Sequence, residues 1–255
     1  IQVGQKFFTF GPREDTNALS PPAPVAVIPK PTEDVKAPGP EPQQAVDKVA
    51  RLWSMKGELL ATLSGHAEAL TAACFSASGA LLLTASRDGT ARLWSHQKTQ
   101  LACLSDHRST ILKTRFSPDG LQMLTLGQDG TARLFAVSGE PGPVLRGHTQ
   151  AVTDGAFSPC GELLVTVSYD GSVRVWDRGG TLRAGFAAHA APIASVGFSP
   201  SGERLVTASW DTTARLWDGD GKPGGVLRGH ESRVLAAMFS PDGERLLTAG
   251  RDRTA

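Results

Sequence analysis

At 255 residues, of which 40% are hydrophobic, the chain is long enough to bury a sizeable apolar core. Its 26 lysines and arginines nearly balance its 25 aspartates and glutamates, so the formal net charge is +1. This balance excludes attraction of nucleic acid or anionic lipid by a strong overall positive field, and any recognition by charge must be local.

Cysteine usage and hydropathy narrow the class of protein further. The three cysteines, Cys74, Cys103 and Cys160, lack the short spacings of disulfide frameworks and zinc sites, so we expect reduced thiols and no metal. No uninterrupted apolar run reaches the roughly 20 residues that a membrane helix needs, and no signal peptide opens the sequence. These features predict a cytoplasmic protein that does not insert into a membrane.

Residues 1–46 differ in composition from the rest of the chain. Nine prolines fall there, mixed with alanine, glutamate and lysine. Such a composition favours an extended or disordered tether. We expect a proline-rich linker to another domain, in preference to a ligand for a proline-binding module, followed by a folded domain over residues 47–255.

A repeat of 41 residues organises the sequence from about Val49 to the end. Five of the six histidines keep this spacing, and series of aspartates, threonines, phenylalanines and tryptophans follow the same step. No insertion or deletion interrupts the register. A fixed period of this length is the signature of a repeat architecture.

Within one period, short strand-like runs alternate with turn signals. Between His148 and Gly185 the runs AVTDGAFS, ELLVTVS and VRVWD are separated by Ser-Pro-x-Gly and Asp-Gly motifs, each of which favours a tight turn. No stretch shows a sustained helical period of apolar residues. Each unit is therefore predicted to form four short antiparallel strands, which gives an all-β fold.

Three motifs give the units a family resemblance. They are the Gly-His pair at Gly147-His148, the Phe-Ser-Pro-Asp-Gly run at 116–120 and the Trp-Asp pair at Trp176-Asp177. Together with the period, these motifs resemble WD repeats, whose units are the four-stranded blades of a β-propeller. The resemblance covers the whole repeat region and implies a β-propeller fold.

The pattern predicts four complete blades, from His66 to about Gly229, and two half-blades. The first half-blade lies around 49–54 and 58–63, and the second ends near Gly250. A ring closed by the two half-blades would have five blades, whereas seven is the commoner number that the resemblance implies. We therefore expect part of a larger, seven-bladed ring.

Each unit contains a histidine, a threonine and an aspartate, which are the residue types of a nucleophilic triad. A catalytic site is normally built once, whereas this set occurs five times at constant spacing. In WD repeats the corresponding residues form a buried hydrogen-bonded network with the tryptophan, and the resemblance implies that structural role here. The predicted network residues are His66, Thr84, Asp88 and Trp94; His107, Thr125 and Asp129; His148, Thr166, Asp170 and Trp176; His189, Thr207, Asp211 and Trp217; and His230, Thr248 and Asp252. Phe135 replaces one tryptophan and lacks its N–H donor, so its network should be the weakest.

The resemblance also implies that partners bind at the rim, beside the histidine loop and just before the turn aspartate. These positions vary from unit to unit although their neighbours repeat, and they include the aromatic and arginine side chains that dominate binding hot spots. The predicted rim residues are Arg87, Gln128, Tyr169, Trp210 and Arg251 before the aspartates, and Leu112, Arg233 and Leu235 beside the histidine loops.

The expected function is a non-catalytic interaction scaffold that docks a peptide or partner domain on the propeller rim, within a larger multidomain chain. Binding of nucleic acid or phosphoinositide through the rim arginines is one alternative, and the balanced charge disfavours nucleic acid. A propeller enzyme is the other alternative. The sequence contains no G-x-S-x-G, Walker-type, H-E-x-x-H or calcium-loop motif, so no catalytic residue, cofactor or metal is predicted.

Overall fold

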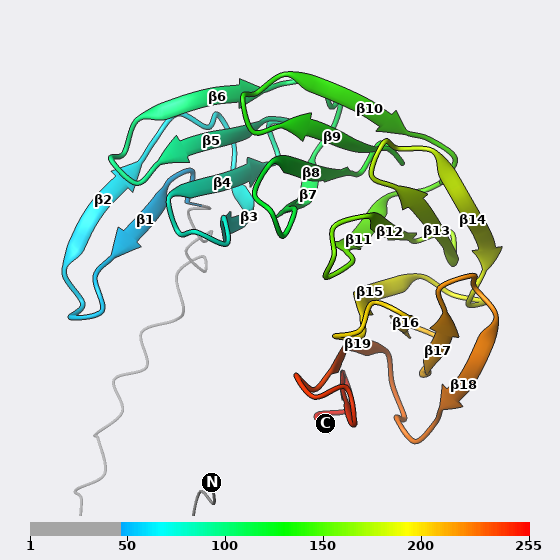
Figure 1. Ribbon diagram of the computed structural model, residues 1–255. Coiled ribbons are helices and arrows are strands. Elements are labelled where there is room, and N and C mark those ends of the chain that lie inside the picture. The colour runs from blue at the N-terminus through cyan, green and yellow to red at the C-terminus, as the bar shows by residue number, and fades with distance from the viewer. Residues whose placement is uncertain (1–46) are drawn as a thin grey trace, which may run out of the picture. The chain divides into compact units, whose positions relative to one another are not determined.

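The computed structural model describes residues 47–255, which form twenty β-strands and no helix (Figure 1). The predicted proline-rich segment, residues 1–46, lies outside the described residues. In the part of the chain that the structure describes, there is accordingly no helix that could cross a membrane. The strands are β1 (Ala50–Trp53), β2 (Leu59–Leu63), β3 (Leu70–Phe75), β4 (Leu81–Ser86), β5 (Ala91–Ser95), β6 (Gln100–Leu104), β7 (Ile111–Phe116), β8 (Gln122–Gly127), β9 (Ala132–Ala136), β10 (Pro141–Leu145), β11 (Val152–Phe157), β12 (Leu163–Ser168), β13 (Ser172–Asp177), β14 (Leu182–Ala187), β15 (Ile193–Phe198), β16 (Arg204–Ser209), β17 (Ala214–Asp218), β18 (Pro223–Leu227), β19 (Val234–Phe239) and β20 (Leu246–Gly250).

The strands pair antiparallel with their neighbours in chain order to form six sheets within residues 47–255. Four sheets have four strands each, namely β3 to β6, β7 to β10, β11 to β14 and β15 to β18. Two sheets have two strands each, β1 with β2 and β19 with β20. The predicted all-β propeller, with four complete blades and two half-blades, is confirmed. The number of seven blades stays a prediction.

The turns between strands follow from the residues that recur there. Between β7 and β8, the backbone N–H of Gly120 donates to the carbonyl of Ser117 at 2.9 Å, and Gly120 has a φ of +72°. Gly130, in the turn between β8 and β9, has a φ of +76°. Glycine adopts this left-handed conformation without the strain that a Cβ would bring, so these hairpins stay tight.

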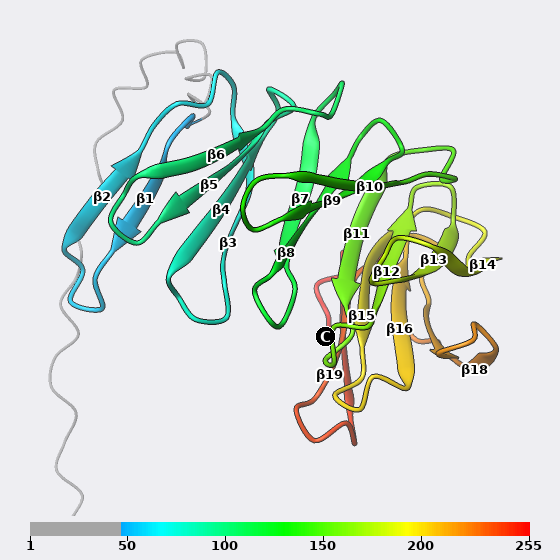
Figure 2. The same cartoon turned by 45° about the horizontal axis from the view of Figure 1, so that its top comes forward.

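Consecutive blades pack against each other through their first strands. Within residues 47–255, β3, β7, β11, β15 and β19 lie side by side in chain order on the inner side of the arc of blades, and the fourth strands lie on the outer side (Figures 1 and 2). The side chains between blades include Leu83, Ile111, Leu124 and Val165, each at most 1% exposed. The buried apolar side chains of residues 47–255 form five clusters, each shared by two neighbouring units, so stacking of the repeats buries apolar surface between every pair of neighbours.

Polar side chains on the inner strands also link consecutive blades. Asp154 on β11 accepts a hydrogen bond from the backbone N–H of Val196 on β15 at 3.3 Å. One period later, Ser195 on β15 accepts a hydrogen bond from the backbone N–H of Ala237 on β19 at 3.1 Å. The carboxylate of Asp154 also lies 3.1 Å from Nζ of Lys113 on β7. A single buried carboxylate thus connects three blades.

Candidate functional site

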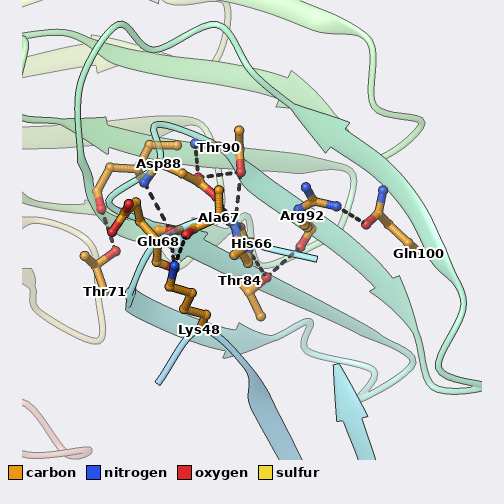
Figure 3. Close-up of polar contacts among 12 residues, drawn as sticks. Lys48, His66, Ala67, Glu68, Thr71, Thr84, Asp88, Thr90, Arg92 and Gln100 are labelled. Atoms are coloured by element: carbon orange, nitrogen blue, oxygen red, sulfur yellow. Dashed lines mark hydrogen bonds and ion pairs between the residues drawn. The ribbon is translucent and has the colours of Figure 1, made fainter. Parts of the chain in front are cut away.

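A chain of hydrogen bonds joins the histidine loop of each blade to its second strand and to its turn aspartate. In the blade of β3 to β6, Nε2 of His66 lies 2.9 Å from Oγ1 of Thr84, and Nδ1 lies 3.1 Å from Oδ2 of Asp88 (Figure 3). The indole N–H of Trp94 on β5 donates to the same Thr84 oxygen at 2.9 Å. The histidine loop, β4, the turn after β4 and β5 are thereby fixed to one another.

The same contacts recur in the other units. The shortest distances from Nε2 to the threonine Oγ1 and from Nδ1 to the aspartate carboxylate are, in that order, 2.8 and 3.1 Å for His107 with Thr125 and Asp129, 2.9 and 3.3 Å for His148 with Thr166 and Asp170, 2.8 and 2.8 Å for His189 with Thr207 and Asp211, and 2.9 and 2.8 Å for His230 with Thr248 and Asp252. Trp176 and Trp217 each donate to their threonine at 3.0 Å. Phe135 is buried at the equivalent place and has no N–H to donate.

Further donors, which are not among the predicted network residues, hold each aspartate. In the first complete blade, the hydroxyl of Thr90 donates to Oδ1 of Asp88 at 2.7 Å, and the backbone N–H of Thr90 donates to the same oxygen at 2.8 Å. The backbone N–H of Ala67 donates to Oδ2 at 2.8 Å. The hydroxyl two residues after the aspartate repeats at the same period and could have been found from it: Thr90, Thr131, Ser172, Thr213 and Thr254.

Burial and hydrogen bonding set the charge states of the network. Burial lowers the pKa of four histidine rings below the ordinary 6.5, namely His66, His107, His148 and His189. Burial alone would raise the pKa of Asp88 and Asp170, but hydrogen bonds from hydroxyl and backbone N–H groups outweigh it and bring each to about 2. The rings are therefore neutral at pH 7 and the carboxylates are charged. A neutral ring that donates from Nδ1 to the carboxylate can accept the threonine hydroxyl proton at Nε2.

The two variable series at the rim are joined to each other through the backbone. The N–H of Tyr169 donates to the carbonyl of Ala151 at 3.0 Å, and the N–H of Arg251 donates to the carbonyl of Arg233 at 2.9 Å. The residue before each turn aspartate bonds in the same way to the residue three past the histidine in the other units. Each blade therefore presents both variable residues side by side at the same end of its strands.

Several predicted rim residues come together in one groove. The rings of Tyr169 and Trp210, from adjacent blades, contact each other with centroids 5.2 Å apart and planes tilted by 50°. The guanidinium carbon of Arg233, from the next unit, lies 3.9 Å from the centroid of a Trp210 ring. A shallow groove of about 270 Å³ beside this cluster is lined by Leu112, Lys113, Thr153, Tyr169, Ala194, Trp210 and Leu235.

Three other predicted rim residues are not part of the groove lining. Arg87 and Gln128 are exposed on their own blades and do not line it, and neither does Arg251. Conversely, Lys113 on β7 lines the groove although the predicted rim set omits it. Its equivalents in the other complete units are Ala72, Asp154 and Ser195. Variation between units, the signal used for the predicted rim residues, was therefore present at this position too.

Comparison with known families supports the propeller fold. Residues 44–255 match the family model described as the IFT122 first beta-propeller. The chain belongs to this family. No individual curated protein matches the chain. The match extends over the entire repeat region and confirms the WD-repeat resemblance of this IFT122-type propeller.

The unit with Phe135 offers an internal comparison for the network of this IFT122-type propeller. Thr166→Ala orphans two buried groups, the indole N–H of Trp176 and Nε2 of His148, so we expect the free energy of unfolding to fall by about 2–3 kcal/mol. Thr125→Ala orphans only Nε2 of His107, so we expect a loss smaller by about 1 kcal/mol. Urea unfolding of the two variants measures the difference. Equal losses would contradict the assigned role of the indole.

The lowered pKa values predict loss of stability in mild acid. Four histidines with pKa values below the ordinary 6.5 take up protons on unfolding, so their stabilising contribution is complete above pH 6.5 and is lost as the pH falls through their folded values. Each such histidine contributes a slope of up to about 1.4 kcal/mol per pH unit in that range. The aspartates act in the same direction only below about pH 4. Urea midpoints should fall from pH 7.5 to pH 5.5, and an unchanged or higher midpoint would contradict this account.

Proposed function

We propose that this propeller is a non-catalytic platform that docks a protein or peptide partner on the rim formed by its histidine loops and turn aspartates. The frame beneath the rim repeats from blade to blade, so it offers the same rigid support in each unit. Residues that differ between units carry the recognition. This division between a constant frame and a variable rim is typical of loop-based binding on a rigid scaffold.

The observation that carries the proposal is the groove beside Tyr169 and Trp210. Aromatic and arginine side chains dominate the energetics of protein interfaces. Here a tyrosine, a tryptophan and an arginine from three consecutive units are in contact. Tyr169 is 38% exposed and Trp210 is half-buried, so both rings are accessible yet held in place. An anchored aromatic cluster loses little side-chain entropy when a partner binds it.

The histidine, threonine and aspartate sets do not support an enzymatic alternative. The hydroxyl of Thr84 is buried, with 1% of the residue exposed, and it already accepts the indole N–H of Trp94. The other four units hold the equivalent hydroxyl in the same contact with histidine. A nucleophile needs access to its substrate, whereas these hydroxyls are hydrogen-bonded within the blade.

Removal of the Tyr169 and Trp210 rings should abolish capture of the partner. Capture of proteins from a lysate of the source organism is compared between the unaltered chain and a Tyr169→Ala, Trp210→Ala variant. We expect at least a tenfold loss of the specifically captured protein, because truncating a hot-spot aromatic costs about 2 kcal/mol or more. Quantitative mass spectrometry gives the measurement.

Leu121→Ala is the matched control, since Leu121 is an exposed apolar residue in the turn between β7 and β8, at the opposite end of the strands. Melting temperatures of both variants are compared with that of the unaltered chain. A partner that the double variant retains would place the binding face elsewhere. A partner lost equally by Leu121→Ala would also contradict the proposal.

A further inference from the structure

Arg233 is held in a fixed orientation at the edge of the groove. Its guanidinium carbon lies 3.9 Å from the centroid of a Trp210 ring, which is within the range of a cation–π contact. The side chain is exposed, and it makes no hydrogen bond or ion pair with any residue between 47 and 255. A guanidinium that lies over an aromatic ring and has no hydrogen-bond partner keeps its N–H groups available to a planar acceptor such as a carboxylate.

The charge beside the groove is positive and comes from Arg233. Lys113 is the charged residue of the groove lining, and its Nζ lies 3.1 Å from the carboxylate of Asp154. Asp154 also accepts from the backbone N–H of Val196, and its side chain is only 4% exposed, so it is fully engaged inside the propeller. Arg233 has no such partner within the described residues, and Arg251 lies next to it through a backbone hydrogen bond of 2.9 Å. A ligand with a negative charge would satisfy this end of the groove.

Apart from Lys113 and Thr153, the groove is lined by apolar and aromatic residues. Leu112 on β7, Ala194 on β15 and Leu235 on β19 line it together with the two aromatic rings. A ligand therefore needs an aliphatic or aromatic side chain close to its carboxylate. Acidic residues next to apolar residues in an extended peptide supply that combination.

The geometry of the rings disfavours a nucleic-acid base. One face of Trp210 is covered by Arg233, and the ring of Tyr169 meets Trp210 at a tilt of 50°. Proteins that bind single-stranded nucleic acid stack bases on open aromatic faces along a positively charged groove. Here Arg233 occupies one face of Trp210, and the net charge of the chain is only +1.

We infer that the groove beside Tyr169 and Trp210 binds an acidic peptide segment, with an aspartate or glutamate carboxylate on Arg233 and a neighbouring apolar side chain against Leu112 and the rings. This inference rests on the proposed function and specifies the chemistry of the partner. Arg233 provides selectivity for acidic segments, because a carboxylate can accept two parallel N–H bonds from the edge of its guanidinium. The aromatic rings supply the contact area.

A library of random twelve-residue peptides displayed on phage is selected on the full chain, and peptides that need Trp210 are identified by counter-selection on Trp210→Ala. We expect these peptides to be enriched in aspartate or glutamate beside an apolar residue. Their affinities are then measured by fluorescence anisotropy with synthetic labelled copies. Arg233→Met keeps an unbranched side chain over the Trp210 ring and removes the charge, so we expect about a tenfold weaker affinity.

Arg245→Met is the matched control. Arg245 is exposed and lies in the turn between β19 and β20, whereas Arg233 precedes β19, so the two residues are at opposite ends of the same hairpin. The control changes the net charge equally and should leave the affinity unaltered. Melting temperatures of Arg233→Met and Arg245→Met should match that of the unaltered chain.

Peptides that need Trp210 but show no acidic enrichment, and that bind Arg233→Met as tightly as the unaltered chain, would overturn this inference and leave the proposed function standing. A single-stranded DNA 20-mer that binds the unaltered chain and loses affinity with Trp210→Ala would overturn the inference in favour of nucleic acid. If no displayed peptide depends on Trp210, the inference also fails. The protein-capture experiment then decides the proposed function separately.

Discussion

The hydrogen-bonded chain from aspartate through histidine to threonine is the constraint on which the rest of this propeller depends. In each unit it joins the loop before the first strand to the turn between the second and third strands. It does so through hydrogen bonds of the histidine ring with a threonine hydroxyl and an aspartate carboxylate. Orphaning any member would leave a buried donor or acceptor unsatisfied, which is costly. The loop and the turn are therefore held at one distance in every blade, and the variable residues beside them are brought to the same end of the strands.

The backbone hydrogen bonds at the rim are the same in each blade, so blades differ there only in the side chains that they present. Because the backbone hydrogen bond between Tyr169 and Ala151 has its equivalent between Trp210 and Pro192 in the next blade, the two rings reach the same height on adjacent blades and contact each other. Arg233, which occupies the equivalent of the Pro192 position in the third unit, contacts Trp210. The groove is thus a product of the repeat itself, since three units place different side chains at equivalent positions. Recognition is concentrated where those side chains are large.

The sequence predicted the blades, the strand order and the network residues because these features depend on contacts within one period. It predicted less about the groove, because contacts between units depend on how far one blade is rotated against the next, which the period does not encode. The contact of Arg233 with Trp210 was missed for this reason, whereas Lys113 was missed although its position varies between units in the sequence. Arg87 and Gln128 meet the same positional rule as Tyr169, yet they do not line the groove, although Gln128 belongs to the blade that contributes Leu112 and Lys113. The hydroxyl of Thr90 was also missed, although a hydroxyl residue repeats at this position in each unit.

The central claim is that neutral histidines donate from Nδ1 to aspartate and accept the threonine hydroxyl at Nε2. Nitrogen-15 NMR of the imidazole rings at pH 7.5 tests it most directly, because the two tautomers and the charged form have different ring-nitrogen shifts. The account predicts that His66, His107, His148 and His189 are neutral and carry their proton on Nδ1. Rings that are charged at this pH, or that carry the proton on Nε2, would contradict it.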